Sequence, residues 1–205
     1  ETGEIYGNVN VKPLYGKGGS GIFKIGKKLK IMACNLTKGR ELPCKSGVGG
    51  LKSITFADFG TLGALTIAND IVTDFGGSPT FMKFDVKGNS TMDTTVTSSR
   101  ENGTTFYETS VVMNLIFQEE KTQAEIKLLA VSRPHIIVED YNGNFRLVGK
   151  DHGCELTTGT FSNGAAMGDL YGYSLTFVSQ ETEAPDFVTT AAYNAESQGT
   201  QIDVN

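Results

Sequence analysis

The residues best suited to chemistry are two histidines and three cysteines, and their spacing assembles no site. His135 and His152 do not lie at ligand spacing, and Cys34, Cys44 and Cys154 are odd in number with no CxxC pair. These patterns predict thiols in a reducing compartment, with neither a disulfide framework nor a zinc site. A catalytic pair of Cys and His would need a third group to orient the base, and none is evident. We therefore expect no catalytic residue, no metal and no cofactor.

Three glycine-containing motifs imitate nucleotide sites. Residues 16–21 spell G-x-G-x-x-G but precede a strand-like stretch, whereas a dinucleotide site joins a strand to a helix. Residues 21–28 spell most of a phosphate-binding loop, yet Lys28 stands where Ser or Thr is required. Residues 74–76 read Asp-Phe-Gly without the H-R-D motif of a kinase. All three are interpreted as accidents of composition.

Charge is distributed unevenly over the 205 residues, whose net charge is -5. Residues 1–52 hold nine Lys and one Arg against three Glu, a net +7, and residues 53–205 carry -12. The basic part is either a solvated Lys surface or a region that docks onto an acidic surface of a neighbouring copy. A nucleic-acid groove formed by Lys24, Lys27, Lys28 and Lys30 is the competing interpretation, but Arg is scarce and aromatic residues are few there.

The composition indicates a chain of many turns that does not cross a membrane. Glycine is abundant at 25 residues and tryptophan is absent. No run of about 18 apolar residues exists, so we expect no spanning helix and no membrane partner. The first residues also lack the charged and apolar parts of a signal peptide.

One good helix is predicted, at about residues 122–132. Thr122 and Glu125 fit a capping box, in which each side chain satisfies a backbone donor at the helix start. Pro134 disfavours helical geometry at the residue before it, so the helix should end near Ser132. Its expected buried face is a stripe of apolar residues: Ala124, Leu128 and Val131, widened by Ile126 and Leu129.

The remaining patterns predict strands. Residues 135–141 and 144–149 should form a tight hairpin, because Asn142-Gly143 supplies the pair with positive φ that a two-residue turn requires. Residues 91–99 and 104–117 should form a long projecting hairpin whose Thr-rich edges need a neighbouring subunit. Shorter strands are expected within 21–32, 81–87, 154–160 and 173–179, with Met82, Phe84 and Val86 facing the core. The apolar runs at 54–59 and 65–72 are expected to be either strands or a strand and a buried turn.

These elements predict a mainly β fold, a β-sandwich or barrel with one flanking α-helix and a long projecting hairpin. We expect an arm or loop at residues 1–20, a single β domain at 21–188 and a C-terminal extension at 189–205.

The second half of the chain contains several distinctive stretches. They are residues 138–148 with the Asn142-Gly143 turn, residues 149–158, the run Gly168-Asp169-Leu170-Tyr171-Gly172-Tyr173, Leu175-Thr176-Phe177 and the acidic residues 181–185. These stretches resemble structural proteins of tailed bacteriophages, and most closely tail tube and tail-ring, or head-tail joining, proteins of phages that infect Bacteroides and related hosts. The resemblance covers about a third of the chain well and the first half poorly.

This resemblance implies a non-enzymatic virion protein of the phage tail or neck, assembled in the cytoplasm of the bacterial host. Family members form hexameric rings, or rings of higher symmetry, that contact neighbouring tail or connector proteins. Their inner sheets line a channel through which DNA passes without specific binding. The acidic segment after residue 52 is the expected source of the channel wall, because lysine contacts would grip phosphates.

Two other classes of function compete with a ring protein. A capsid decoration or carbohydrate-binding β-sandwich module is the first alternative, although a chain with no Trp and seven Tyr is poorly equipped for stacking on sugars. A hydrolase with a cryptic site is the second. A large discrete ring in solution would favour the ring protein over both.

Overall fold

The structure is a computed structural model that describes residues 39–42, 44–86, 89–199 and 202. The chain divides into two units, Glu1–Pro43 and Cys44–Asn205, and every helix and strand named below belongs to the second. The arm expected at residues 1–20 and the strand expected within residues 21–32 lie outside the described residues.

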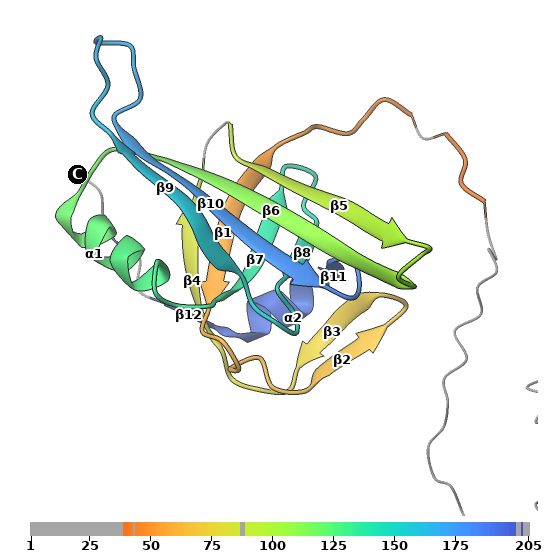
Figure 1. Cartoon of the computed structure of the whole chain (residues 1–205). Helices are drawn as coiled ribbons and strands as arrows, with labels where there is room; N and C mark the ends of the chain where they lie inside the picture. Colours follow the sequence, from red (N-terminus) through yellow and green to blue (C-terminus); the bar gives the residue numbers. More distant parts are fainter. Residues whose placement is uncertain (1–38, 43, 87–88, 200–201, 203–205) are drawn as a thin grey trace, which may run out of the picture. The chain divides into compact units, whose positions relative to one another are not determined.

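The second unit is mainly β, as the sequence predicts, and is built from two sheets and two helices (Figure 1). The larger sheet has eight strands in the order β12 (Ser197–Gln198), β4 (Thr80–Asp85), β1 (Leu51–Ala57), β7 (His135–Asp140), β8 (Phe145–Val148), β11 (Asp186–Val188), β3 (Ile71–Phe75) and β2 (Leu65–Ala68). The smaller has four, in the order β5 (Thr91–Ser99), β6 (Thr104–Ile116), β10 (Gly172–Glu181) and β9 (Glu155–Ser162). The helices are α1 (Glu120–Leu129) and α2 (Thr190–Ala195).

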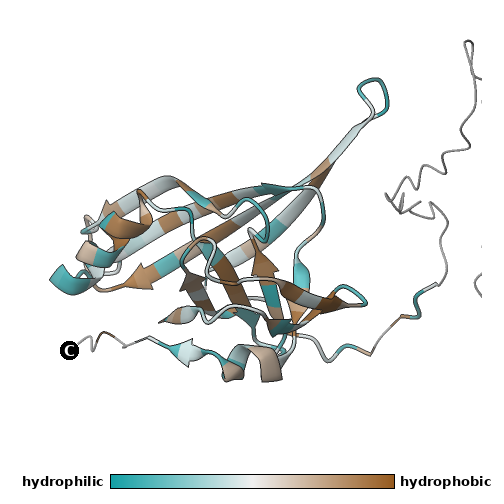
Figure 2. Cartoon of the chain, turned by 90° about the horizontal axis from the view of Figure 1, so that it is seen from below, coloured by the Kyte–Doolittle hydropathy of each residue, from teal (hydrophilic) through white to brown (hydrophobic). Residues whose placement is uncertain are grey.

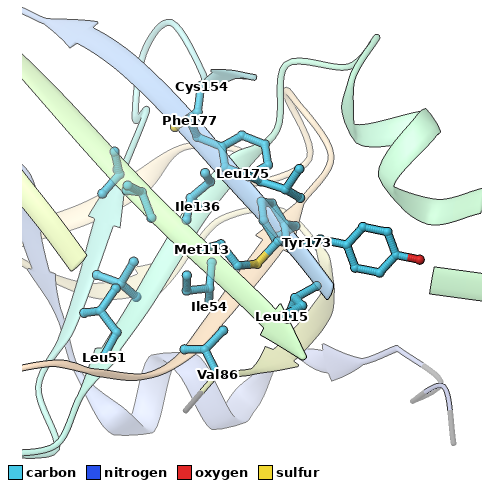
Figure 3. Packing of buried hydrophobic residues seen from close by; sticks show 14 of the residues in the cluster. Leu51, Ile54, Val86, Met113, Leu115, Ile136, Cys154, Tyr173, Leu175 and Phe177 are labelled. Atoms are coloured by element: carbon cyan, nitrogen blue, oxygen red, sulfur yellow. The ribbon is translucent and has the colours of Figure 1, made fainter. Parts of the chain in front are cut away.

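The main core lies between the two sheets. Strand side chains alternate between faces, so every second residue of β1, β7, β6 and β10 points into this layer. Figure 3 shows these side chains meeting from both sides, and Tyr173 points toward α1. The buried members of this cluster are Leu51, Ile54, Phe56, Val86, Val111, Met113, Leu115, Ile126, Ile136, Val138, Val148, Cys154, Tyr173, Leu175 and Phe177.

A second core covers the opposite face of the eight-stranded sheet, under α2. Tyr193 of α2 stacks on Phe145 with ring centroids 4.6 Å apart and on Phe81 at 5.3 Å. Its hydroxyl is 2.9 Å from the Thr55 hydroxyl, so its polar end is also satisfied. Brown, apolar stretches along the central strands in Figure 2 mark a sheet that is buried on both faces. Part of the expected C-terminal extension therefore packs against the sheet, and α2 is a helix that the sequence patterns did not predict.

The predicted start and buried face of the first helix are wrong. α1 begins three residues after Phe117, its N-cap is Glu119, and no side chain caps it. Thr122 is buried in the first turn, where it is not a cap. The buried stripe is Thr122, Ile126 and the half-buried Leu129. Leu128 and Val131 are 61% and 85% exposed, because the helix is rotated from the predicted stripe.

The predicted two-residue turn between β7 and β8 is also wrong, although the hairpin exists. β7 ends at Asp140 and β8 begins at Phe145, so four residues connect them, and of the Asn-Gly pair only Gly143 has positive φ, at 79°. The Asp140 carboxylate stabilises this longer loop by accepting hydrogen bonds from the backbone of Asn142 and Asn144, both at 2.8 Å. Burial opposes its ionisation, but the hydrogen bonds from Asn144 and Asn142 outweigh that effect and lower the pKa of Asp140.

Two further strand predictions are corrected. The run expected at residues 65–72 is divided into β2 and β3 by a turn at Asn69 and Asp70, both with positive φ. Phe84 of β4 and Val86, directly after it, pack in the main core as expected, but Met82 of β4 is 46% exposed. Phe81 is fully buried in the second core, since both faces of this sheet are covered.

A glycine clasp, formed by Gly63, Gly76 and Gly77, closes the base of the β2–β3 hairpin. Gly76 and Gly77 donate backbone hydrogen bonds to Ala64 at 3.0 Å and Leu62 at 2.9 Å. A Cβ on Gly63 would lie 2.3 Å from the Gly77 nitrogen, and one on Gly77 would lie 2.0 Å from the Thr61 oxygen. Two backbones touch at this point, so only glycine fits.

Candidate assembly and channel surfaces

His135 holds two loops together through its two ring nitrogens. Its Nε2 accepts a hydrogen bond from the Gly60 backbone N–H at 3.0 Å, so its Nδ1–H donates to the Gly149 carbonyl at 2.6 Å. Phe59 stacks on the ring, with centroids 5.1 Å apart. Burial lowers the pKa of His135, while Gly149 and nearby carboxylates act weakly in the opposite direction. Both nitrogens of the neutral ring are thus occupied.

In the described part of the chain, none of the other residues considered for chemistry hydrogen-bonds to the His135 ring. Cys154 is buried in the main core, and burial raises the pKa of its thiol to about 12, which makes it a poor nucleophile. His152 is exposed, and its Nδ1 lies 2.9 Å from Glu181. Cys44 is exposed and distant in the fold, and Cys34 lies outside the described residues. Within the described ranges no cluster of His, Cys, Asp or Glu could hold a metal ion.

The residues that the structure describes include no helix long and apolar enough to cross a membrane.

The four-stranded sheet has an unusual charge: β5, β6, β9 and β10 contain no Lys, Arg or His. Their carboxylates are Asp93, Glu108, Glu155 and Glu181. The eight-stranded sheet, by contrast, carries Lys52, Lys83, His135 and Arg146. Basic side chains are thus absent from the four-stranded sheet and present in the eight-stranded sheet.

The outer face of this sheet, which points away from the core, carries mostly hydroxyl and amide groups. The register places Thr91, Val112, Thr176 and Thr158 in one row across the strands, and most neighbouring rows are also polar, with Phe106 and Ile116 as apolar members at the two ends of β6. We call this surface the hydroxyl face. Its members are Thr91, Asp93, Thr95, Thr97 and Ser99 of β5, Thr104, Phe106, Glu108, Ser110, Val112, Asn114 and Ile116 of β6, Ser174, Thr176, Val178 and Gln180 of β10, and Glu155, Thr158, Thr160 and Ser162 of β9.

Both edges of this sheet are open in the described chain. β5 and β9 each pair with one strand only, and most of their residues are exposed. The β5–β6 hairpin predicted from the sequence is present, with Thr91 to Ser99 paired to Val112 to Thr104. Thr-rich open edges with one carboxylate each and no lysine are a template for pairing with another chain.

A loop between β9 and β10 projects beyond the sheets (Figure 1). The Asp169 carboxylate accepts hydrogen bonds from the backbone N–H groups of Ala165 and Ala166, both at 2.8 Å, and these bonds lower the pKa of Asp169. Met167, at the tip, is fully exposed. The loop is thus preorganised around its own carboxylate.

An apolar groove of about 800 Å³ lies between α1 and β4. Its walls include Met82 and Phe84 of β4, Leu128 and Leu129 of α1, and Phe117 before α1. Its remaining lining is Phe56, Ala57, Asp58, Thr80, Lys83, Asp85, Leu115, Ile116, Thr122, Glu125, Ser132, Pro134 and Ile202. Among the described residues, only β12 pairs with the outer edge of β4, and it reaches only Thr80 and Phe81.

The sequence patterns predicted the long hairpin and its edges but neither the groove nor the basic-free sheet. The groove joins residues from five separate stretches of chain, so no local pattern marks it. The absence of basic residues is visible in the sequence only when the four strands are known to share one sheet.

Comparison with known protein-family models, with curated proteins and with solved structures found no match for this chain.

Proposed function

We propose that the chain is a non-enzymatic structural subunit of a phage virion, which assembles into rings of the tail tube or head-tail connection. The hydroxyl face of each subunit lines the channel through which DNA passes. Neighbouring copies and adjacent tail or connector proteins are its partners.

The observation that supports this proposal best is the absence of Lys, Arg and His from all four strands of one sheet. Each lysine or arginine that contacts a phosphate releases counterions and adds salt-dependent affinity for DNA. A wall of hydroxyls with a few carboxylates makes no such contact. Duplex DNA can therefore slide past it.

The open edges supply a way to close a ring. If β5 of one subunit pairs with β9 of the next, the four-stranded sheets join into one continuous wall, and every edge within the ring is paired. Such a contact joins two different surfaces of neighbouring subunits. Contacts of this kind form a ring when the rotation from one subunit to the next brings the last subunit back to the first. The eight-stranded sheet, with its basic residues, then lies outside.

Shortening the β5–β6 hairpin tests ring formation. Thr97 pairs with Phe106, so deletion of residues 98–103 leaves residues 104–105, changed to Asn-Gly, as a two-residue turn. The deletion removes exposed edge and leaves the core intact. We expect a folded protein by circular dichroism and a lower ring fraction by size-exclusion chromatography with light scattering. Unchanged assembly would refute the role of this hairpin.

Lysines on the hydroxyl face test the channel. Thr158 and Thr176 are adjacent across β9 and β10, and the variant T158K/T176K places two charges on this face. The control T66K/T73K adds the same charge to exposed positions of β2 and β3. Rings of the first variant should bind duplex DNA in a salt-dependent way, whereas wild-type and control rings should not. Equal DNA binding by the two variants would contradict a channel wall at this face.

A further inference from the structure

The groove between α1 and β4 has the chemistry of a site for an added strand. An extended segment bound to a sheet edge gains backbone hydrogen bonds from the edge and specificity from pockets for alternate side chains. In this fold the edge is β4 beyond Phe81, and the pocket is lined by apolar residues that are partly exposed: Met82 is 46%, Phe117 60% and Leu128 61% exposed.

Carboxylates surround this apolar lining. Asp58, Asp85 and Glu125 line the groove against one lysine, Lys83, which is 3.1 Å from Asp85. Asp58 and Glu125 have no basic partner among the described residues. The fitting occupant is therefore an extended segment with one apolar face and several positive charges.

Residues 21–32 of this chain have that pattern. Read with a period of two, Ile25, Leu29 and Ile31 fall on one face together with Lys27, and Lys24, Lys28 and Lys30 fall on the other. The segment carries four lysines and no acidic residue. Its charge complements the groove, and its apolar face matches the lining.

The structure also shows where the preceding chain enters the fold. The Asn142 side chain accepts a hydrogen bond from the Val48 N–H at 2.9 Å and donates one to the Val48 carbonyl at 2.8 Å. This pair fixes residues 44–50 at the start of β1, beside Asp140, while Phe56 and Ala57, at the end of β1, line the groove. The entry point and the groove thus lie at opposite ends of one strand, about 20 Å long at 3.3 Å per residue.

We propose that residues 21–32 of a second copy occupy this groove and link subunits stacked end to end. When copies stack in one direction, the entry end of one faces the groove end of the next. Residues 33–50, which span at most roughly 60 Å when extended, are long enough to cross that junction. The inference rests on the proposed function only in taking the rings to stack.

Photo-cross-linking of the full chain identifies the occupant. Benzoylphenylalanine replaces Leu128 in the groove or, as a control, Ile67, which is 41% exposed on β2. The sample mixes isotopically light and heavy chains. We expect Leu128, but not Ile67, to cross-link to residues 21–32, in products that join light to heavy chains. Cross-links confined to residues 200–205, to the β9–β10 loop or to residues of the same chain would overturn the proposal.

Substitutions then separate stacking from ring formation. L29D/I31D places two carboxylates on the apolar face of the segment, and V9D/V11D makes the same change elsewhere in the first unit. The first variant should lose the Leu128 cross-link and form single rings that do not stack in electron micrographs, whereas the second should behave as wild type. Stacks that persist in L29D/I31D would refute the proposal. Absence of rings from the wild type would instead refute the proposed function, and the cross-links would still report the occupant.

Discussion

At the level of single residues, buried polar groups in this fold join segments that are distant in the sequence. His135 is the clearest case, since its two nitrogens join the loop before Leu62 to the loop after β8. The sequence places His135 at the start of a predicted strand but cannot reveal Phe59 or Gly60 as partners, because they lie some seventy-five residues away. Such contacts depend on the tertiary fold.

Protonation of His135 should destabilise the fold at mildly acidic pH. The folded state lowers the pKa below its ordinary value of 6.5, so the unfolded chain takes up the proton first. The contribution is complete above pH 6.5 and is lost as the pH falls through the folded-state pKa. Urea denaturation between pH 7.5 and 5.5 should show this loss in the wild type and a smaller loss in H135N. If the unfolding free energy of H135N fell with pH as steeply as that of the wild type, groups other than His135 would account for the loss.

The two described cysteines should differ sharply in reactivity. Cys44 is exposed, whereas Cys154 is buried with its thiol pKa raised to about 12. In the native protein at pH 7.5, iodoacetamide should label Cys44 quickly and Cys154 only after urea is added, as mass spectrometry of peptides can measure. Rapid labelling of Cys154 without urea would mean that the main core opens readily.

At the level of elements, α1 shows why periodicity alone places a helix only approximately. Its apolar residues are compatible with two stripes, one through Leu128 and one through Ile126. Tertiary packing decides between them: the Tyr173 hydroxyl accepts a hydrogen bond from the Glu119 N–H at 3.2 Å and holds the helix start beside the start of β10. The β7 and β8 strands, by contrast, are near their predicted positions because β-branched residues and the turn define them locally.

The buried stripe of α1 can be verified by two alanine substitutions. Ile126 is 2% exposed, so I126A should cost about 2–5 kcal/mol of unfolding free energy. L128A removes a side chain that is 61% exposed and should change it by at most about 0.5 kcal/mol. Urea unfolding of monomeric protein provides the measurement. A larger loss for L128A would restore the stripe first predicted from the sequence.

Helix α2 should contribute to stability although it lies in the expected C-terminal extension. Tyr193 is 6% exposed and stacks on two rings of the sheet, so Y193A should cost about 3–5 kcal/mol. N194A, at an exposed neighbouring position, is the matched control. If Y193A left thermal or urea unfolding unchanged, the packing of α2 on the sheet would not contribute to the unfolding free energy.

At the level of the whole molecule, the sequence was sufficient for the mainly β class and the long hairpin but not for the division into two sheets. That division depends on pairing between distant strands, such as β10 with β6 and β1 with β7. The candidate surfaces therefore became visible only in the fold. The uneven charge along the chain, in contrast, was evident from the start.

Charge also predicts how assembly and DNA binding respond to salt. We expect the isolated protein to bind duplex DNA weakly or not at all at physiological salt, and rings to dissociate as salt is raised, because the +7 and -12 regions attract each other between copies. Fluorescence anisotropy and light scattering can follow the two processes. Tight DNA binding that is abolished by changing Lys24, Lys27, Lys28 and Lys30 to Glu, with assembly intact, would favour the nucleic-acid groove instead.

The glycine clasp has a consequence for how the sequence can change over evolutionary time. Surface threonines can be exchanged for serine or asparagine with little loss, so strand sequences are free to drift until similarity disappears. Gly63, Gly76 and Gly77 cannot be substituted in this way, because any Cβ there would overlap backbone atoms of the opposing segment. A lone glycine followed, thirteen positions on, by a glycine pair should therefore persist in descendants of this chain that keep the β2–β3 hairpin, after most other identities have been lost.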